Sequence, residues 1–255
     1  MPTPPYDSYI ICTSPRSGST LLCKLLAETG KSGNPNSHFH NPSLASWLET
    51  YGFHNSEFST EQDALSAIFD AARTRGTANT GIFGLRMQRT SFDFFMQQTA
   101  ALFPGLQGDA ERIQAAFGHT LLIYLTRPNK LDQAISRVKA TQTGLWHMAA
   151  DGSELERQSE PKKPHYDADA ISHHLAELSE LDDAWKTWFK RERLKPLIIS
   201  YDDLSSNPRK TLGVILNALG LKNSTAQSLI PPTKKLADEV NRIWADRFLA
   251  ERSGG

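Results

Sequence analysis

The stretch YIICTSPRSGSTLLCKLLAETG, residues 9–30, decides how this chain folds. Its first part, residues 9–12, is a short apolar run of the kind that forms a strand covered on both faces. Its last part, residues 20–29, carries four leucines at helical spacing and stops at Gly30, a residue type that commonly ends helices. The residues between these parts therefore form a tight connection from a buried strand to a helix.

That connection is suited to hold an anion. The first turn of a helix leaves backbone N–H groups unpaired and carries a partial positive charge, so Ser17, Gly18, Ser19 and Thr20 would surround an oxyanion with donors. Gly18 lets the backbone approach closely, and Arg16 adds a guanidinium fork. An ordinary turn with a serine cap would explain the capping, but not the arginine and the glycine together.

The loop differs from that of nucleotide triphosphatases, which reads GxxxxGK[ST]. Here Ser19 follows Gly18 where lysine would stand, and Thr13 stands where the first glycine would be. A triphosphate with magnesium needs more positive charge than this loop supplies, whereas a singly charged sulfuryl group on a phosphate needs less. We therefore expect an anion site that works without metal.

The rest of the chain alternates between strand and helix patterns. Further strands are predicted at residues 81–87, 120–125 and 197–201, and helices at 131–138, from near 167, at 207–220 and at about 238–249. This alternation is typical of an α/β fold, here a P-loop-like three-layer sandwich with a central, mainly parallel sheet flanked by helices. Residues 1–255 are predicted to form a single domain.

The composition excludes several classes of protein. Lysine and arginine number 28, as do aspartate and glutamate, so we do not expect a nucleic-acid binder held mainly by phosphate contacts. No stretch reaches the roughly 18 apolar residues of a membrane span, and the N-terminus does not read as a signal peptide. Cys12 and Cys23 lack metal or disulfide spacing and suit a reducing compartment. These features indicate a cytoplasmic protein.

Two segments look like surface excursions. Residues 33–79 are rich in histidine, asparagine, serine and aromatic side chains, and residues 151–166 read DGSELERQSEPKKPHY. The second segment could close over a site as a lid, but its polarity favours a solvated loop.

The segments described so far resemble the sulfotransferases that use 3′-phosphoadenosine 5′-phosphosulfate (PAPS), and within them the Stf0-type, trehalose 2-sulfotransferase-like family. The SPRSGST loop is similar to the one that holds the 5′-phosphosulfate in that family. A second segment, YLTRPNKLDQAISRVKATQTGLW at residues 124–146, implies that Arg127 and Ser136 hold the 3′-phosphate. Arg127 also follows a predicted strand, at the edge where open α/β sheets bind ligands. Weaker similarities lie at residues 81–87, 201–204 and 234–248.

The resemblance implies a general base soon after the first helix, where the family carries glutamate in a G-x-P-x-E segment. This chain reads GNPNSHFH at residues 33–40, which puts Ser37 at that position, and serine cannot act as that base. A neutral imidazole can, so His38 and His40 are candidates, although both could be loop residues without a chemical role. We rank His38 first because it adjoins Ser37, and expect His40 to face the same way along an extended chain. Arg16 is expected to stabilise charge on the reacting group.

Other candidates lie near the expected site. Arg86 ends the strand predicted at 81–87, and Trp146 follows the nucleotide helix, so both are candidates to contact an acceptor. His147 could line the same pocket. His173 and His174 read as solvated helix residues, and no cluster in the sequence shows metal-ligand spacing.

Three functions remain open. The first is an enzyme that moves a sulfuryl group from PAPS to a hydroxyl of a carbohydrate or glycolipid acceptor, possibly trehalose. The second is a nucleotide-binding homologue without transferase activity, for which Ser37 is the best argument. The third is a small-molecule kinase, against which the absent lysine counts. The resemblance also implies a homodimer.

Overall fold

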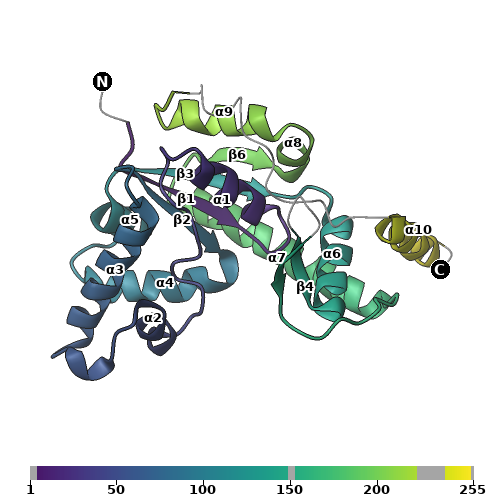
Figure 1. Ribbon diagram of the computed structural model, residues 1–255, viewed down its shortest axis with the longest axis horizontal. Coiled ribbons are helices and arrows are strands. Elements are labelled where there is room, and N and C mark those ends of the chain that lie inside the picture. Colours follow the sequence, from purple (N-terminus) through teal and green to yellow (C-terminus); the bar gives the residue numbers. More distant parts are fainter. Residues whose placement is uncertain (1–4, 149–152, 223–238, 254–255) are drawn as a thin grey trace.

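A four-stranded parallel sheet runs through the centre of the molecule, in the order β2-β1-β3-β6 (Figure 1). The computed structural model describes residues 5–148, 153–222 and 239–253. The strands are β1 (Ser8–Thr13), β2 (Phe83–Gln88), β3 (Thr120–Thr126) and β6 (Leu197–Ser200). Because the four strands are parallel, their carboxyl ends meet at one edge of the sheet, where such sheets bind ligands.

Helices cover both faces of this sheet, which confirms the predicted three-layer α/β architecture. On β1, Ile10 and Cys12 pack into one core cluster, while Tyr9 and Ile11 pack into another on the opposite face. The first cluster is covered by α2 (Leu44–Tyr51), α3 (Glu61–Thr77), α4 (Arg89–Leu102), α5 (Asp109–Phe117) and α7 (Ala168–Arg191). The second is covered by α1 (Ser19–Glu28), α8 (Tyr201–Ser206) and α9 (Pro208–Ala218).

A third, smaller core lies beside the sheet, between α6 (Lys130–Thr143), α7 and α10 (Glu239–Ser253). In Figure 1 α6 and α10 lie in the right-hand part of the molecule. The predicted last helix is confirmed from Glu239 onward; its expected start at 238, and the part of the similarity at 234–238, lie outside the described residues.

The expectation that residues 33–79 form a surface excursion is wrong. They contain α2, the short 3-10 helix η1 (Asn55–Glu57) and α3, and Phe39 and Trp47 are each only 1% exposed in the main core. Ser43 and Thr60 cap the two α-helices by accepting hydrogen bonds from the backbone N–H groups of Ser46 and Asp63. The aromatic side chains that gave the segment an unusual composition are thus core residues.

The expectation that residues 151–166 form a solvated loop is partly wrong. Within them β5 (Glu154–Arg157) pairs in antiparallel fashion with β4 (Leu145–Met148). β5 is mostly exposed, so it lacks the buried apolar pattern by which strands are recognised in sequence. The hairpin is anchored to the end of α6, because the Arg157 guanidinium donates a hydrogen bond to the Thr143 carbonyl.

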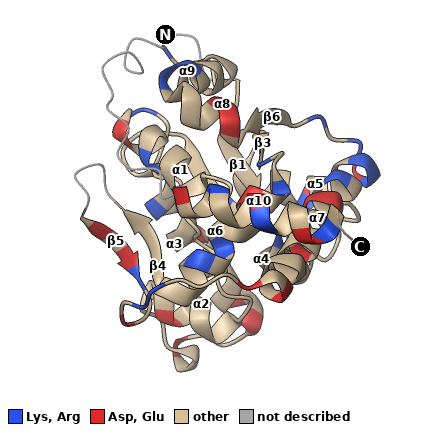
Figure 2. Ribbon diagram, turned by 90° about the vertical axis from the view of Figure 1, so that its right-hand side faces the viewer, with Lys and Arg blue, Asp and Glu red and all other residues tan. Residues whose placement is uncertain are grey.

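Charges of both signs are mixed along the described chain in the view of Figure 2. Lysine and arginine are interspersed with aspartate and glutamate along the ribbon (Figure 2), in keeping with the formal net charge of +0. No described helix is both long enough and apolar enough to span a membrane. Cys12 and Cys23 are buried free thiols, as their spacing predicted.

A buried polar network ties the end of β1 to α6 and α7. The Asp182 carboxylate, on α7 and 3% exposed, accepts hydrogen bonds from Thr126 and Ser14 and pairs with the Lys130 ammonium at 2.5 Å. The Gln133 side chain donates to the Pro15 carbonyl at 2.6 Å. These contacts fix residues 14–15, from which the loop before α1 begins.

We expect Asp182→Asn to lower the free energy of unfolding by roughly 3 kcal/mol, because it leaves the Lys130 cation without its buried partner. Urea denaturation measures the change. Asp183→Asn is the matched control: the Asp183 side chain is 73% exposed in a surface pair with Lys186, and its removal should cost less than about 1 kcal/mol. Equal losses in both variants would contradict the role given to the network.

Candidate active site

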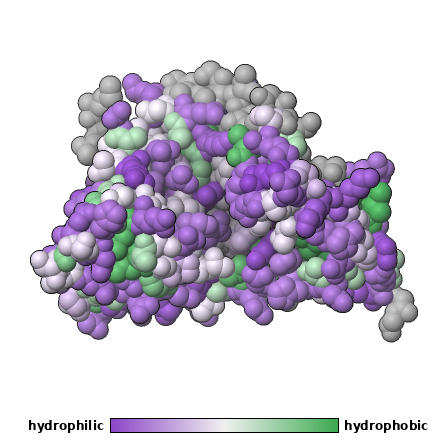
Figure 3. Space-filling view, turned by 60° about the horizontal axis from the view of Figure 1, so that its bottom comes forward, coloured by the Kyte–Doolittle hydropathy of each residue, from purple (hydrophilic) through white to green (hydrophobic). Residues whose placement is uncertain are grey.

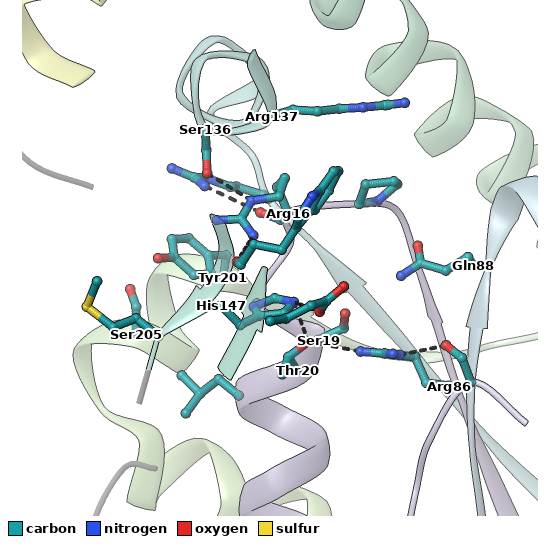
Figure 4. Close-up of a pocket in the computed structure, with 18 of the residues that line it drawn as sticks. Arg16, Ser19, Thr20, Arg86, Gln88, Ser136, Arg137, His147, Tyr201 and Ser205 are labelled. Atoms are coloured by element: carbon teal, nitrogen blue, oxygen red, sulfur yellow. Dashed lines mark hydrogen bonds and ion pairs between the residues drawn. The ribbon is translucent and has the colours of Figure 1, made fainter. Parts of the chain in front are cut away.

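A cavity of about 910 Å³ lies at the carboxyl edge of the sheet, over the N-terminus of α1. The space-filling view shows the mostly hydrophilic surface of one face of the molecule (Figure 3), and the close-up shows the side chains that line the cavity (Figure 4). The predicted site residues among its lining are Arg16, Gly18, Ser19, Thr20, His40, Arg86, Arg127, Ser136 and Trp146.

The loop before α1 depends on two residues with left-handed backbone. Arg16 has φ 63° and Gly18 has φ 86°. Residues other than glycine adopt this backbone conformation only at a cost in energy. A Cβ on Gly18 would also stand 2.7 Å from the Tyr201 ring. Glycine is therefore required at position 18 both for the turn and for the close approach of α8.

The donors at the start of α1 are not consumed by a side-chain cap. Gly18 is the N-cap residue, and no side chain caps this helix. The Ser17 hydroxyl is buried and bonded to Thr13, so Ser17 helps to shape the loop and does not line the cavity. An ordinary turn capped by serine is thus ruled out as an account of the loop, and the helix N-terminus stays suited to an anion.

The two motifs predicted to share one nucleotide meet in the structure. The Arg16 side chain donates to the Ser136 hydroxyl (Nε to Oγ, 3.1 Å) and to the Trp146 carbonyl. The Arg127 guanidinium lies 3.4 Å from the Arg16 carbonyl and 4.4 Å from the centre of the Tyr201 ring. Figure 4 shows Arg16 reaching from the loop toward Ser136 on α6. Segments more than a hundred residues apart thus form one site.

Positive charge at this site is poorly compensated. Arg127 is 5% exposed, and the carboxylate paired with it, that of Asp132, is 4.0 Å away. Within the described ranges, Arg16 pairs with no carboxylate. Burial, and then the nearby Arg127, lower the pKa of Arg16 to about 10; burial lowers that of Arg127 as well. A buried cation and a half-buried one brought together in this way favour an anionic partner.

Arg86 reaches the same loop from β2. Its Nε donates to the Ser37 hydroxyl at 2.8 Å, and its Nη1 donates to the Thr20 hydroxyl at 2.9 Å. The Thr20 hydroxyl also lies 3.0 Å from Nε2 of His147. Ser37 therefore fixes the guanidinium of Arg86 against the first turn of α1.

The histidines at 38 and 40 do not face the same way. The chain turns at residues 38–39 instead of staying extended, so His40 lines the cavity while His38 points into the core. Nε2 of His38 lies 3.2 Å from the Asn34 carbonyl, and burial lowers the pKa of its ring to about 4. The expectation about their orientation is wrong; the roles given to His38 and His40 in proton transfer stay predictions.

The family model for the Stf0 sulphotransferases matches residues 8–251 of this chain. The chain belongs to the Stf0 sulphotransferase family. This confirms the resemblance drawn from the loop and from the segment at 124–146, and it makes the protein a sulfotransferase. Within the matched span lie the cavity and every predicted site residue.

Two trehalose 2-sulfotransferases are similar to this Stf0 sulphotransferase over nearly its whole length. The one from Mycobacterium tuberculosis is 28% identical, covering 95% of this chain and 94% of the relative. The one from Mycolicibacterium smegmatis is 27% identical, covering 97% of each. Among solved structures, a sulfotransferase from Alicyclobacillus acidocaldarius matches with a TM-score of 0.45 and 14% identity, covering 95% and 91% of the two chains. The sulfotransferase domain of the Synechococcus olefin synthase gives 0.44 and 16%, covering 98% and 89%.

Several cavity residues of this Stf0 sulphotransferase were not predicted as site residues. Gln88 ends β2 and Tyr201 follows β6, so both could have been found from their place at the carboxyl ends of strands. Glu156 could not, because it reaches the cavity only through the unpredicted pairing of β5 with β4.

A correction concerns His173 and His174. The sequence indicated no cluster with metal-ligand spacing, yet on α7 their ring nitrogens and the Glu177 carboxylate come within 4.8 Å of one another. The Arg137 guanidinium already pairs with Glu177 at 2.9 Å, and the His173 side chain is 74% exposed. The exposed position predicted for His173 is confirmed. The Glu177 carboxylate already has the Arg137 guanidinium as its cationic partner.

Burial of neutral His38 should make the fold sensitive to acid. Between about pH 6.5 and 4 the unfolded chain binds a proton that the native ring does not, so stability falls as the pH falls through this window. Urea denaturation at about pH 7 and pH 5 measures the free energy of unfolding. Relative to the wild type, that of His38→Gln should rise by on the order of 1–2 kcal/mol between pH 7 and pH 5. His173→Gln, at an exposed site, should not gain. A difference between His38→Gln and wild type that stays constant with pH would contradict this account.

Proposed function

We propose that this Stf0 sulphotransferase moves a sulfuryl group from PAPS to a hydroxyl of a carbohydrate or glycolipid acceptor. The observation that carries the proposal is the meeting of Arg16 and Arg127 at the carboxyl edge of the sheet. Among the described residues Arg16 pairs with no carboxylate, and that of Asp132 is 4.0 Å from Arg127. A donor with anionic groups at two separate positions of one nucleotide matches two such cations. A nucleotide with a single phosphate chain would leave one of them unused.

In this proposal the loop and α6 hold different ends of the donor. The backbone N–H groups at residues 17–20 and the Arg16 guanidinium bind the 5′-phosphosulfate, while Arg127 and Ser136 bind the 3′-phosphate. Arg86 is on β2, on the other side of β1 from the strand that Arg127 follows, and it is close enough to the loop to stabilise charge on the sulfuryl oxygens. Three guanidinium groups then supply the positive charge, and we expect transfer to need no metal.

The acceptor is expected to be rich in hydroxyl groups. The cavity lining includes the neutral polar side chains of Asn36, Ser37, Gln88 and Thr90, together with Trp146, whose aromatic ring suits the apolar face of a sugar. Trehalose is the first acceptor to test because the two relatives are trehalose 2-sulfotransferases. The segment at 33–40 departs from the family pattern next to this part of the cavity, so other sugars and glycolipids belong in the same screen. We expect a cytoplasmic homodimer.

Calorimetric titration without metal tests the donor assignment. The proposal expects 3′-phosphoadenosine 5′-phosphate to bind clearly more tightly than ADP, and transfer of labelled sulfate from PAPS to an acceptor to follow. Tight binding with no transfer to any sugar would favour the nucleotide-binding homologue suggested by Ser37. Binding that requires magnesium, or no preference for the 3′-phosphate, would contradict the proposal.

Arg127→Ala should weaken the binding of 3′-phosphoadenosine 5′-phosphate by about 100-fold, because the truncation removes the charge expected to hold the 3′-phosphate. Binding of AMP, which lacks that phosphate, should change no more than about threefold. Arg73→Ala removes an equal charge from an exposed pair with Asp70 on α3 and should leave both affinities unchanged. Equal losses for the two nucleotides in Arg127→Ala would sink the assignment.

A further inference from the structure

The hairpin formed by β4 and β5 brings a histidine into the cavity. Nε2 of His147, on β4, lies 3.0 Å from the Thr20 hydroxyl and 3.4 Å from Oε2 of Glu156 on β5. In Figure 4 its ring stands directly over the start of α1, beside Ser19 and Thr20. This is the turn of the loop at which the sulfuryl group of the proposed donor would sit.

The hydrogen bonds around Thr20 offer that nitrogen a hydroxyl hydrogen to accept. Arg86 can only donate, so the Thr20 hydroxyl accepts from it and has its own hydrogen to give to Nε2 of His147. The ring is neutral, because burial and the charges of Arg16, Arg86 and Lys24 lower the pKa of His147 to about 4. In the tautomer that accepts at Nε2, the lone pair of the neutral ring points to the Thr20 hydroxyl, on the cavity wall, where another hydroxyl can take its place.

We propose that His147 is the general base of this sulfotransferase, and that Glu156 stabilises the imidazolium formed when Nε2 takes the proton. The inference rests on the proposed function, since it assumes a sulfuryl donor in the loop. The acceptor hydroxyl takes the place of the Thr20 hydroxyl at Nε2. The displaced Thr20 hydroxyl is then available to a sulfuryl oxygen.

The step balances as follows. The acceptor oxygen forms a bond to sulfur while the bond from sulfur to the bridging oxygen of the 5′-phosphate breaks, and that electron pair leaves with the phosphate. The acceptor's proton passes to Nε2 of His147 and from there to solvent. The products are a sulfate ester and 3′-phosphoadenosine 5′-phosphate, with no change in oxidation state.

The charges near His147 couple its basicity to donor binding. Two of the groups that lower its pKa, Arg16 and Arg86, are the groups expected to bind the anionic donor. The donor's negative charge offsets them, and Glu156 remains beside the ring, so the pKa of His147 should rise toward its ordinary value once the donor is bound. The base is thus strengthened at the stage at which it is needed.

His40 is the other histidine on the cavity wall, and its geometry is less defined. Its carbonyl accepts a hydrogen bond from Ser91, but within the part of the chain that the structure describes its ring has no hydrogen-bond partner and stays exposed. His147 is held by Thr20 and faced by a carboxylate. A general base must lie within hydrogen-bond reach of the proton that it takes, whatever its pKa. This requirement favours His147.

Kinetics with PAPS and the best acceptor found test the inference. His147→Gln should lower kcat by about 100-fold or more while the affinity for 3′-phosphoadenosine 5′-phosphate stays within about threefold, and it should abolish the acid limb of the pH profile of kcat. Glu156→Gln should keep that limb but move it to lower pH, because a carboxylate 3.4 Å from the ring favours the imidazolium. His173→Gln, on the exposed face of α7, is the matched control and should retain wild-type kcat.

Two results would overturn the inference while leaving the proposed function intact. One is an unchanged kcat and acid limb in His147→Gln, above all if His40→Gln loses both. The other needs no acceptor: in NMR titrations of the full chain, 3′-phosphoadenosine 5′-phosphate should raise the pKa of the His147 ring, and a pKa that does not move contradicts the coupling. If the wild type shows no preference for that nucleotide over ADP, the donor assignment fails instead.

Discussion

The repulsion between two guanidinium groups, that of the half-buried Arg16 and that of the buried Arg127, is the constraint on which the site depends. Arg16 and Arg127 are held together although burial and their shared charge disfavour it, so the rest of the fold must fix the loop that carries Arg16. It does so from three sides. Trp185 donates to the Thr13 carbonyl, Gln133 donates to the Pro15 carbonyl, and α8 places Tyr201 against Gly18, where only glycine fits. An anion that relieves the repulsion is bound by a loop that is already in place, which lowers the entropy cost of binding.

The same positive charge sets the protonation of the groups around it. Burial first, and then the charges of Arg16 and Arg86, lower the pKa of His147 and keep its ring neutral. A general base in such a place would be weak in the free protein and stronger with the donor bound. Binding and proton acceptance are then two consequences of one set of charges, and neither requires a change of fold.

The sequence was sufficient to predict the elements whose apolar residues follow a simple periodicity. Buried parallel strands are continuous apolar runs, so the central sheet was recognised, and its carboxyl edge located Arg127. It was insufficient where structure comes from long-range packing. The composition of residues 33–79 indicated a loop, but in the structure α3 and the sheet bury Phe39. β5 is mostly exposed and has no apolar pattern by which it could be recognised. His38 was ranked over His40 because it adjoins Ser37, and the two were expected to face the same way along an extended chain. The turn at 38–39 instead leaves only His40 on the cavity wall.

Ser37 connects the proposed base, His147, to Arg86 on β2 through hydrogen bonds. Ser37 is neutral and accepts one hydrogen bond from Arg86, whose other nitrogen then reaches Thr20 and leaves the Thr20 hydrogen for His147. A carboxylate at position 37 would attract the whole guanidinium, as bidentate pairs do, and draw it from Thr20. With the acidic residue of the family pattern absent, the line of hydrogen bonds from Ser37 through Arg86 and Thr20 ends at a neutral imidazole. Serine at position 37 thus removes one proton acceptor and supports the proposed one, His147. The sequence did not predict the strand pair that carries His147.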